Sequence, residues 1–379
     1  MSKVKLGDVA IEHKETCGGS KDGYPIVGLE HLTPEEVTLT AWDEDSDNTF
    51  TKVFRKGNVL FGRRRAYLRK AAVAPFDGIC SGDITVIEAI PDRILPELLP
   101  FIIQNDGLFS FAVGKSAGSL SPRVKWEHLK NYEFELPSMD RQCELAELLW
   151  AMDTTKKSYQ KLIAATDELV KSQFMEQFGS YLGDETRCAT VEQVCTVFAD
   201  GDWIESKDQA DDGIRLIQTG NVGNGVYLDK GERARYIDEE TFARLNCTEV
   251  LPNDILISRL PDPVGRACII PDGLGKSITA VDCSIVRLKS HVLPEFFVAY
   301  TMTTLYAAQI CSSVTGSTRK RISRKNLGQV VIPTPDIDQQ EQFAAFVRQS
   351  DKSKFANLMC SNLNLSGGAS LSREALIGH

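Results

Sequence analysis

A chain of 379 residues is too long for one ordinary hydrophobic core, so its length predicts two or more domains. Hydrophobic residues make up 42% and charged residues 25%, which is typical of a soluble globular protein. No apolar run is long enough to span a bilayer and the N-terminus lacks the apolar core of a signal peptide, so we expect a cytoplasmic protein without a membrane partner. The formal net charge of −9 excludes a protein that coats nucleic acid with its whole surface, but a local basic patch can still bind it.

The ten cysteines are scattered and form no CxxC pair, which indicates reduced, structural thiols and no disulfide framework. The five histidines are remote in sequence from any cysteine pair at ligand spacing. We therefore expect no metal site in this chain.

The two halves of the chain repeat one another. KGNVLFGRR at 56–64 matches PNDILISRL at 252–260, since each has a polar turn and then an apolar strand that ends in arginine. GSLSPRVKWEHL at 118–129 matches GSTRKRISRKNL at 316–327, and the alignment continues to a helix start at which Pro137, Asp140 and Gln142 match Pro335, Asp338 and Gln340. The offset drifts only from 185 to 198 residues, which predicts a gapped tandem duplication in which each half has its own core.

The first part of each half, residues 1–138 and 185–335, predicts an α+β (mixed α/β) domain. Short β-branched runs such as DITVIEAI and DCSIVRL are typical of strands, and glycine-rich turns such as NVGNGVYLDKG separate them. Patches such as LPEFFVAYTMTTLYAAQI are typical of helices. We expect two similar globular domains in tandem.

In the first domain a basic stretch, FGRRRAYLRK at 61–70, follows directly after an apolar strand. A loop on the rigid end of a strand can reach a DNA groove, where arginine grips guanine and both basic side chains bind phosphate. The alternative is a solvated charge run without a partner. The candidate DNA-binding residues of this loop are Arg63, Arg64, Arg65, Tyr67, Arg69 and Lys70.

Residues 139–180 are predicted to form a long central helix. Neither glycine nor proline occurs from Asp140 to Phe178, and about 39 residues make a rod of roughly 58 Å that Gly179 ends. Its apolar residues recur at steps of three and four, as in a coiled-coil seam, and an amphipathic core helix is the alternative. Its length and its position between two globules favour a spacer. The seam residues are Leu145, Leu149, Met152, Tyr159, Ile163, Val170 and Phe174.

The second domain contains three further groups of DNA-binding candidates. SRLPDPVGR at 258–266 presents Arg259 and Arg266 in a loop that its prolines and glycine fix. QTGNVGNG at 218–225 brings Thr219 and Asn221 into one turn, where simple turn chemistry is the alternative. GSTRKRISRKNL shares only Gly-Ser, one arginine and a leucine with its upstream copy, and these shared residues indicate a structural hinge. From its basic residues we expect phosphate contacts, by Arg319, Lys320, Arg321, Arg324 and Lys325.

Residues 336–379 predict a second spacer helix, which begins with DQQEQFAAFVRQSDKSKF and loses its apolar pattern after Phe355. Gly367, Gly368 and the serine- and asparagine-rich composition should stop or fray this helix, so we expect it to be shortened. If the two spacer helices lie antiparallel, the duplication gives a pseudo-twofold axis. Two globules on such a rod can reach successive major-groove faces of DNA, which recur every ~34–36 Å.

The duplicated plan, the stretch GSTRKRISRKNLGQVVIPTPDIDQQEQF and the helix DTTKKSYQKLIAATDELVKSQFMEQFG resemble the DNA sequence-specificity subunit of type I restriction–modification systems over most of residues 5–355. The resemblance implies a non-enzymatic subunit with two target-recognition domains, each of which reads one part of a split double-stranded DNA site. It also implies binding of two copies of a separate methyltransferase subunit, which carries S-adenosylmethionine and methylates adenine. It allows a restriction subunit, a translocating nuclease, to join the complex, and it implies no cofactor in this chain.

The sequence offers little evidence for an enzyme. PDGLGKSIT at 271–279 ends like a phosphate-binding loop but lacks the required first glycine, and no adenine-methylation tetrapeptide of the NPPY type occurs. Two alternatives to the specificity subunit remain open. One is a metal-dependent DNA nuclease that uses the charged cluster of DGDWIESK, namely Asp200, Asp202, Glu205 and Lys207. The other is an assembly adaptor whose helix binds partners without reading DNA.

Overall fold

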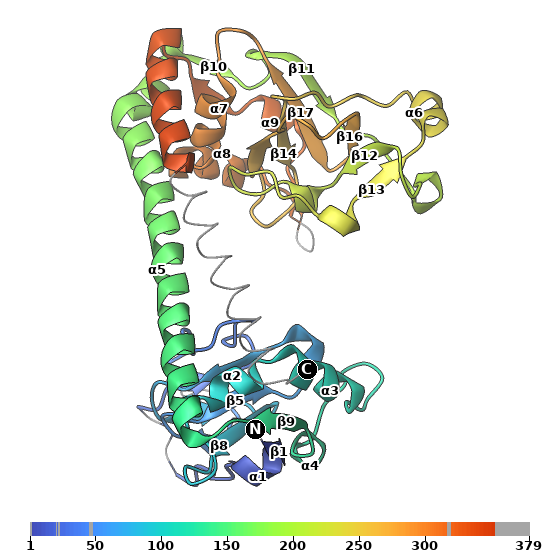
Figure 1. The fold of residues 1–379 in the computed structure, drawn as a ribbon. Coiled ribbons are helices and arrows are strands. Elements are labelled where there is room, and N and C mark those ends of the chain that lie inside the picture. Colours follow the sequence, from blue (N-terminus) through green and yellow to red (C-terminus); the bar gives the residue numbers. More distant parts are fainter. Residues whose placement is uncertain (1, 20, 22, 45–47, 317–319, 353–379) are drawn as a thin grey trace. The chain divides into compact units, whose positions relative to one another are not determined.

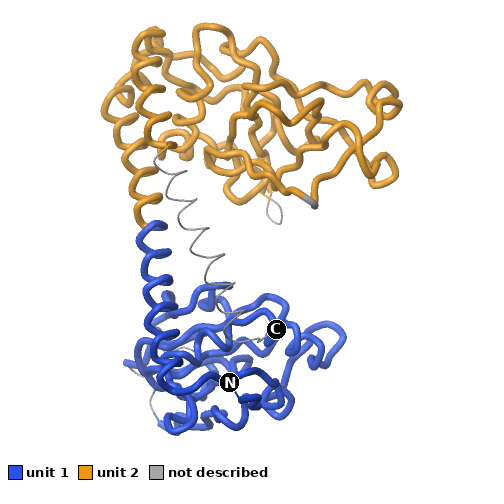
Figure 2. Tube along the Cα trace, viewed as in Figure 1, with its two compact units in different colours: residues 1–160, 358–379 blue, residues 161–357 orange. Residues whose placement is uncertain are grey.

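The computed structural model describes residues 2–19, 21, 23–44, 48–316 and 320–352. The chain divides into two compact units (Figure 2), one that runs from the N-terminus to Gln160 and one that begins at Lys161. We call them unit 1 and unit 2. The long helix α5 (Met139–Phe178) contributes its first part to unit 1 and its last part to unit 2.

Unit 1 combines three small sheets with short helices (Figure 1). Its four-stranded sheet has the order β2–β8–β5–β6, and the strands are Ala10–Glu12, Ile84–Ala89, Val59–Gly62 and Ala71–Val73. A three-stranded sheet has the order β3–β7–β4, with strands Ile26–Val27, Gly78–Cys80 and Lys52–Phe54. Strands β1 (Ser2–Lys5) and β9 (Glu133–Leu136) form an antiparallel pair. The helices are α1 (Leu6–Val9), α2 (Leu99–Ile103), α3 (Asp106–Gly114), α4 (Trp126–Leu129) and the 3-10 turn η1 (Ala66–Leu68).

Unit 2 repeats this plan. Its four-stranded sheet has the order β11–β17–β14–β15, with strands Cys195–Asp200, Cys283–Leu288, Ile255–Ser258 and Ala267–Ile269. The three-stranded sheet has the order β13–β12–β16, with strands Arg235–Ile237, Ile214–Ile217 and Ser277–Thr279. The antiparallel pair is β10 (Cys188–Thr190) with β18 (Val331–Pro333). The helices are α6 (Glu239–Leu245), α7 (Pro294–Thr301), α8 (Thr304–Ser313) and α9 (Arg324–Gly328), and the 3-10 turns are η2 (Gly179–Gly183), η3 (Glu185–Arg187), η4 (Ser206–Asp208), η5 (Thr219–Asn221) and η6 (Gly231–Arg233).

The register of the repeated strands is also the same in both units. Val59 of β5 lies opposite Val73 of β6, and Ile255 of β14 lies opposite Ile269 of β15. In each pair the second-unit residue is 196 positions after the first. The predicted mixed fold with two similar domains is therefore confirmed, and the matching stretches KGNVLFGRR and PNDILISRL occupy equivalent strands.

Strand β5 is buried on both faces. Because successive side chains of a strand point in opposite directions, its residues enter two different cores. Val59 and Phe61 belong to the core that packs against α2, α3 and the start of α5, whereas Leu60 belongs to a second core on the other face. Strand β14 divides its side chains in the same way. A central strand covered on both faces reads as a continuous apolar run, which explains why VLF and ILI carry no polar residue.

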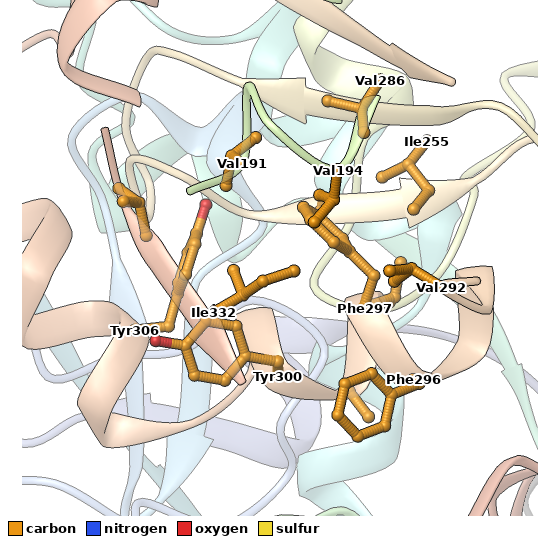
Figure 3. Close-up of a cluster of buried hydrophobic side chains, with 14 of the residues drawn as sticks. Val191, Val194, Ile255, Val286, Val292, Phe296, Phe297, Tyr300, Tyr306 and Ile332 are labelled. Carbon is orange, nitrogen blue, oxygen red and sulfur yellow. The ribbon is translucent and has the colours of Figure 1, made fainter. Parts of the chain in front are cut away.

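The main core of unit 2 is rich in aromatic rings (Figure 3). Phe297 of α7 points toward Val194 and the sheet residues above it in this view, and Phe296 and Tyr300 of the same helix belong to the same core. This core extends to the last turns of α5, where Phe174 packs against further rings. The ring centroids of its four partners lie 5.1–5.5 Å away and belong to Phe178, Phe296, Tyr300 and Phe343.

Residues 337–352 are helical and pack antiparallel to α5 within unit 2. Gln339 accepts a hydrogen bond from Tyr181, and Phe343, one turn later, contacts Phe174 and Phe178, which precede Tyr181. The expected decay of this helix toward residue 379 concerns positions outside the described residues. Among the described residues, no helix is both long and apolar enough to cross a membrane.

Candidate nucleic-acid interface

The basic loop after β5 is hydrogen-bonded on both sides to remote parts of unit 1. The backbone N–H of Arg63 donates to the carbonyl oxygen of Asp83 at 3.0 Å, and the carbonyl of Arg63 accepts from Val124 N–H at 3.0 Å. The backbone of Arg64 pairs with that of Arg123. Residues 63–65 therefore lie between the turn that precedes β8 and the segment 117–125, and together these three pieces form an edge of the unit that we call the basic edge.

Asp83 is the anion within this basic edge. Its carboxylate accepts from Arg123 Nε at 2.7 Å and from Arg123 Nη2 at 3.3 Å, and Arg64 Nη1 lies 3.4 Å away. The bonds to Arg123 hold the pKa of Asp83 below its ordinary value. Arg64 also donates through Nε to the hydroxyl of Ser121 at 2.6 Å. Both arginines are thus oriented by fixed acceptors on the edge itself.

The remaining candidates of this loop fall into two groups. Arg69 pairs with Asp106 and lies over the ring of Phe109, and Lys70 donates to the carbonyl of Leu29 at 2.6 Å, so both side chains hold the loop in place. Arg65 and Tyr67 are exposed, and neither side chain has a hydrogen bond to another part of the chain that the structure describes. These two residues are therefore the best placed in the loop to contact a ligand.

Unit 2 builds its edge from the equivalent segments. The N–H of Arg259 donates to the carbonyl of Asp282 at 2.9 Å, and its carbonyl accepts from Ile322 N–H at 3.2 Å. Arg321 pairs with the carboxylate of Asp282 at 3.2 Å. Arg259 and Asp282 thus occupy the places of Arg63 and Asp83, while Arg321 occupies that of Arg123.

The Arg259 side chain itself is turned inward. It is 4% exposed, donates to the carbonyl of Val281, and lies 3.3 Å from Asp200. Burial lowers the pKa of its guanidinium below the ordinary arginine value. This placement argues against the expected base contact by Arg259 and gives it a supporting role, because a side chain without exposed donors cannot enter a groove.

Arg266 and the 218–221 turn also differ from the expectation of DNA contact. The guanidinium of Arg266 donates to four backbone carbonyls, those of Val222, Leu260, Pro263 and Thr219, at 2.6–3.0 Å. Asn221 is buried, and it accepts from Gln218 N–H and donates to the carbonyl of Leu228. An irregular loop leaves carbonyls without ladder partners, and the five donors of an arginine satisfy them. Both side chains, as placed, hold the loops together.

The basic segment 320–325 supplies exposed cations to the edge of unit 2 that contains Arg259. Lys320 and Lys325 are exposed, whereas Arg324 donates to the carbonyl of Phe198 at 2.9 Å and lies 3.5 Å from Asp200. Arg319 lies outside the described residues. The basic residues of the two units come from different segments of sequence, yet the equivalent hydrogen bonds of Arg63 and Arg259 place these segments on the same edge of each unit.

Sequence reasoning missed Asp83 and Asp282, the carboxylates beneath these arginines. Both aspartates begin the matching strand segments DITVIEAI and DCSIVRL. The repeat itself was therefore the signal that could have identified them, because an acidic residue kept at the same place in both halves suggests a shared contact.

The acidic residues of DGDWIESK do not converge on a common point. Asp200 lies near Arg259 and Arg324, Asp202 accepts from the N–H of Thr248, and Glu205 pairs with Lys207. In the described part of the chain, no group of three or more histidine, cysteine or acidic side chains could hold a metal ion. This arrangement gives no support to the nuclease alternative.

Four of the seven expected seam residues of α5 are buried within the unit to which they belong. Leu145 and Leu149 belong to a core of unit 1, and Val170 and Phe174 belong to the core of unit 2. On the last part of α5, Leu162 and Leu169 are instead 49% and 52% exposed, and Ala165 between them is exposed as well. Steps of three and four residues put these three side chains on one face of the helix.

Comparisons with known proteins agree with this architecture. The family model described as "Type I restriction modification DNA specificity domain" matches residues 186–358. The type I restriction enzyme MjaX specificity subunit of Methanocaldococcus jannaschii is 20% identical over 377 residues, which cover 92% of this chain and 84% of that protein.

Two solved structures share the fold. The S subunit of the type I restriction–modification system from M. genitalium has a TM-score of 0.52 at 12% identity, and the match covers 98% of this chain and 94% of that one. A chain from a structural study of complex assembly and conformational transition of the type I R-M system also has a TM-score of 0.52, at 19% identity, with 99% of this chain and 97% of that chain covered. The matched specificity domain, the relative aligned over most of the chain and the shared fold all make this chain similar to the DNA sequence-specificity subunits of type I restriction–modification systems.

Proposed function

We propose that this chain acts as a DNA sequence-specificity subunit, in which each unit reads one part of a split DNA site with its basic edge. The observation that carries the proposal is the equivalence of the two edges: Arg63 and Arg259 bind the same two backbone neighbours in their units and bring the exposed basic residues to the same place. Exposed lysine and arginine attract phosphate, and side chains at a strand end can enter the major groove. A duplicated edge fits a site in two parts.

We also propose that the chain is not itself catalytic and that it acts with partner subunits. In this proposal a separate methyltransferase subunit, present in two copies, carries S-adenosylmethionine and transfers a methyl group to adenine, and a restriction subunit can join the complex. The acidic residues of DGDWIESK are engaged with separate partners. The proposal of recognition and assembly rests on the similarity to specificity subunits and on the duplicated edge.

The basic edges can be tested by mutation in the complex reconstituted with the methyltransferase. Arg65→Ala or Tyr67→Ala should weaken binding of the cognate site about ten-fold and relax preference in one part of it, because a base contact is worth ~1–3 kcal/mol. The double variant Lys320→Ala/Lys325→Ala should weaken binding to all sequences and reduce the slope of log K against log salt by about 0.9 for each lost phosphate contact. Fluorescence anisotropy at several salt concentrations measures both effects.

Lys3 provides the control for this experiment because it is an exposed lysine on β1 that pairs with Glu133. Lys3→Ala should leave both the affinity and its salt dependence unchanged. Binding that is insensitive to all these variants, or a footprint of one short continuous site, would contradict the proposed reading mode. An assembled complex without salt-dependent DNA binding would favour the adaptor alternative.

We propose that the methyltransferase subunit contacts the exposed face of α5 formed by Leu162, Ala165 and Leu169, since the neighbouring seam residues Val170 and Phe174 are engaged in the core of unit 2. Leu169→Glu puts a charge into this contact and should abolish co-purification with the methyltransferase without lowering the unfolding temperature of the isolated chain. Ala164→Glu adds the same charge two residues after Leu162, on the opposite side of the helix, and should leave assembly intact. Equal assembly of both variants would place the partner elsewhere.

A further inference from the structure

We propose that Asp83 and Asp282 are positioning residues for DNA recognition. Each holds an arginine of its basic edge in one orientation and so reduces the sequence-independent binding of that arginine to DNA phosphate. The inference deepens the proposed function and rests on it. It concerns two aspartates that contact no ligand themselves and act through Arg123 and Arg321.

The contact joins equivalent residues in both units, through two nitrogens of Arg123 in unit 1 and through Nη2 of Arg321 in unit 2. Asp83 uses its carbonyl for the N–H of Arg63 and its carboxylate for Arg123, while Asp282 uses its carbonyl for the N–H of Arg259 and its carboxylate for Arg321. One residue thus ties the backbone of the loop after the central strand to the arginine of the neighbouring segment. GSLSPRVKWEHL and GSTRKRISRKNL share one arginine, Arg123 in unit 1 and Arg321 in unit 2, which the sequence assigned to a structural hinge. In each unit this arginine pairs with the aspartate.

The exposure of the four side chains agrees with a positioning role. The side chains of Asp83 and Asp282 are 21% and 23% exposed, whereas those of Arg123 and Arg321 are 43% and 44% exposed. In each unit the carboxylate is therefore largely covered and the guanidinium faces solvent. A pair formed only to satisfy a buried charge would cover both partners.

The chemistry of the pair sets what the arginine can do. Two donors of Arg123, Nε and Nη2, point at Asp83, so the donors of its other side are held in a fixed direction. A guanidinium without this anion would rotate freely and could bind a DNA phosphate at any sequence. The carboxylate also cancels one positive charge on the edge, which lowers the sequence-independent attraction to DNA.

Replacement of the aspartates in the assembled complex tests this role. Asp83→Asn should raise the affinity for non-cognate DNA, steepen its slope of log K against log salt by about 0.9, and lower the ratio of cognate to non-cognate affinity about ten-fold. Asp282→Asn should have the same effects through the other part of the site. Asp83→Glu, which keeps the charge, should recover most of the ratio.

Two further variants separate positioning from simple structural support. In an Arg64→Ala/Arg123→Ala background, Asp83→Asn should change the affinity ratio no further, because the aspartate acts through these two arginines. Asp77→Asn is the matched control, since it removes one of the two carboxylates that pair with Arg55, an exposed arginine of the same unit outside the basic edge, and should leave both ratio and slope unchanged.

The outcomes distinguish this inference from the proposed function. If the wild-type complex binds a split site but Asp83→Asn and Asp282→Asn lower only the unfolding temperature and leave ratio and slope unchanged, the aspartates are structural and the inference is overturned. If the wild-type complex itself shows no salt-dependent DNA binding, the proposed function fails first. A change of ratio that persists in the Arg64→Ala/Arg123→Ala background also overturns the role assigned to Asp83.

Discussion

Phe174→Ala is expected to lower the free energy of unfolding of unit 2 by about 3–5 kcal/mol, since a buried phenylalanine is replaced and a cavity remains. The ring is fully buried and contacts four other rings, from α5, α7 and the helical segment 337–352. These neighbours are themselves buried and packed, so they cannot collapse into the space that the ring leaves. Thermal unfolding followed by circular dichroism should show the transition of unit 2 about 10 °C lower.

Leu169→Ala is the control for this experiment because Leu169 lies on the same helix but is about half exposed. It should change the unfolding free energy by well under about 1 kcal/mol. If the two variants had similar effects on unfolding, the last turns of α5 would not belong to the core of unit 2. The assignment of Phe174 to internal packing would then be wrong, and the expected contact of Phe174 with a partner subunit would be favoured.

Gln340→Ala is expected to destabilise unit 2 by about 2–4 kcal/mol, since it leaves several backbone groups without partners. The buried amide of Gln340 accepts from Leu293 N–H at 2.9 Å and donates to the carbonyls of His291 and Pro335 at 2.9 and 2.8 Å. It thereby joins the start of the helical segment 337–352 to the N-terminus of α7. Urea unfolding of wild type and variant measures the difference.

The equivalent glutamine of unit 1 gives an independent check. Gln142 accepts from Leu95 N–H and donates to the carbonyl of Pro137, so Gln142→Ala should lower the stability of unit 1 in the same way. Gln342→Ala is the control, because this glutamine is exposed on the same helical segment as Gln340. An equal loss of stability in the Gln342 and Gln340 variants would show that helix propensity, and not the buried amide, is responsible.

The proline–aspartate–glutamine pattern was visible in the sequence as part of the repeat, but its purpose was not. Pro137, Gln142, Pro335 and Gln340 align in both halves, which predicted a common helix start. The structure adds that each glutamine reaches a loop 47 residues earlier in the chain. A contact over that distance leaves no local periodicity, and so only the folded chain could reveal it.

The seam of α5 illustrates the same limit. Its three- and four-residue steps correctly predicted one long helix with an apolar stripe. The pattern could not say whether that stripe faces a partner or the chain's own domains, because both uses require the same spacing. The ring contacts of Phe174 decide it for the last turns of the helix, and the exposed leucines 162 and 169 became a candidate surface only once burial was known.

The amino-acid sequence by itself determined the tandem repeat, the mixed fold of each half, the long helix and the likeness to specificity subunits, because periodicity, turn residues and repeated motifs are local properties of the chain. Only the tertiary structure decided which cations are available. Arg63 and Arg259 look alike in sequence and both hold an edge by their backbone, and the Nε atom of each guanidinium is buried, whereas Arg65 of the same loop is exposed. Whether a guanidinium faces solvent depends on the carbonyls and carboxylates that lie near it. These acceptors are remote in sequence and come near the arginine only in the folded chain.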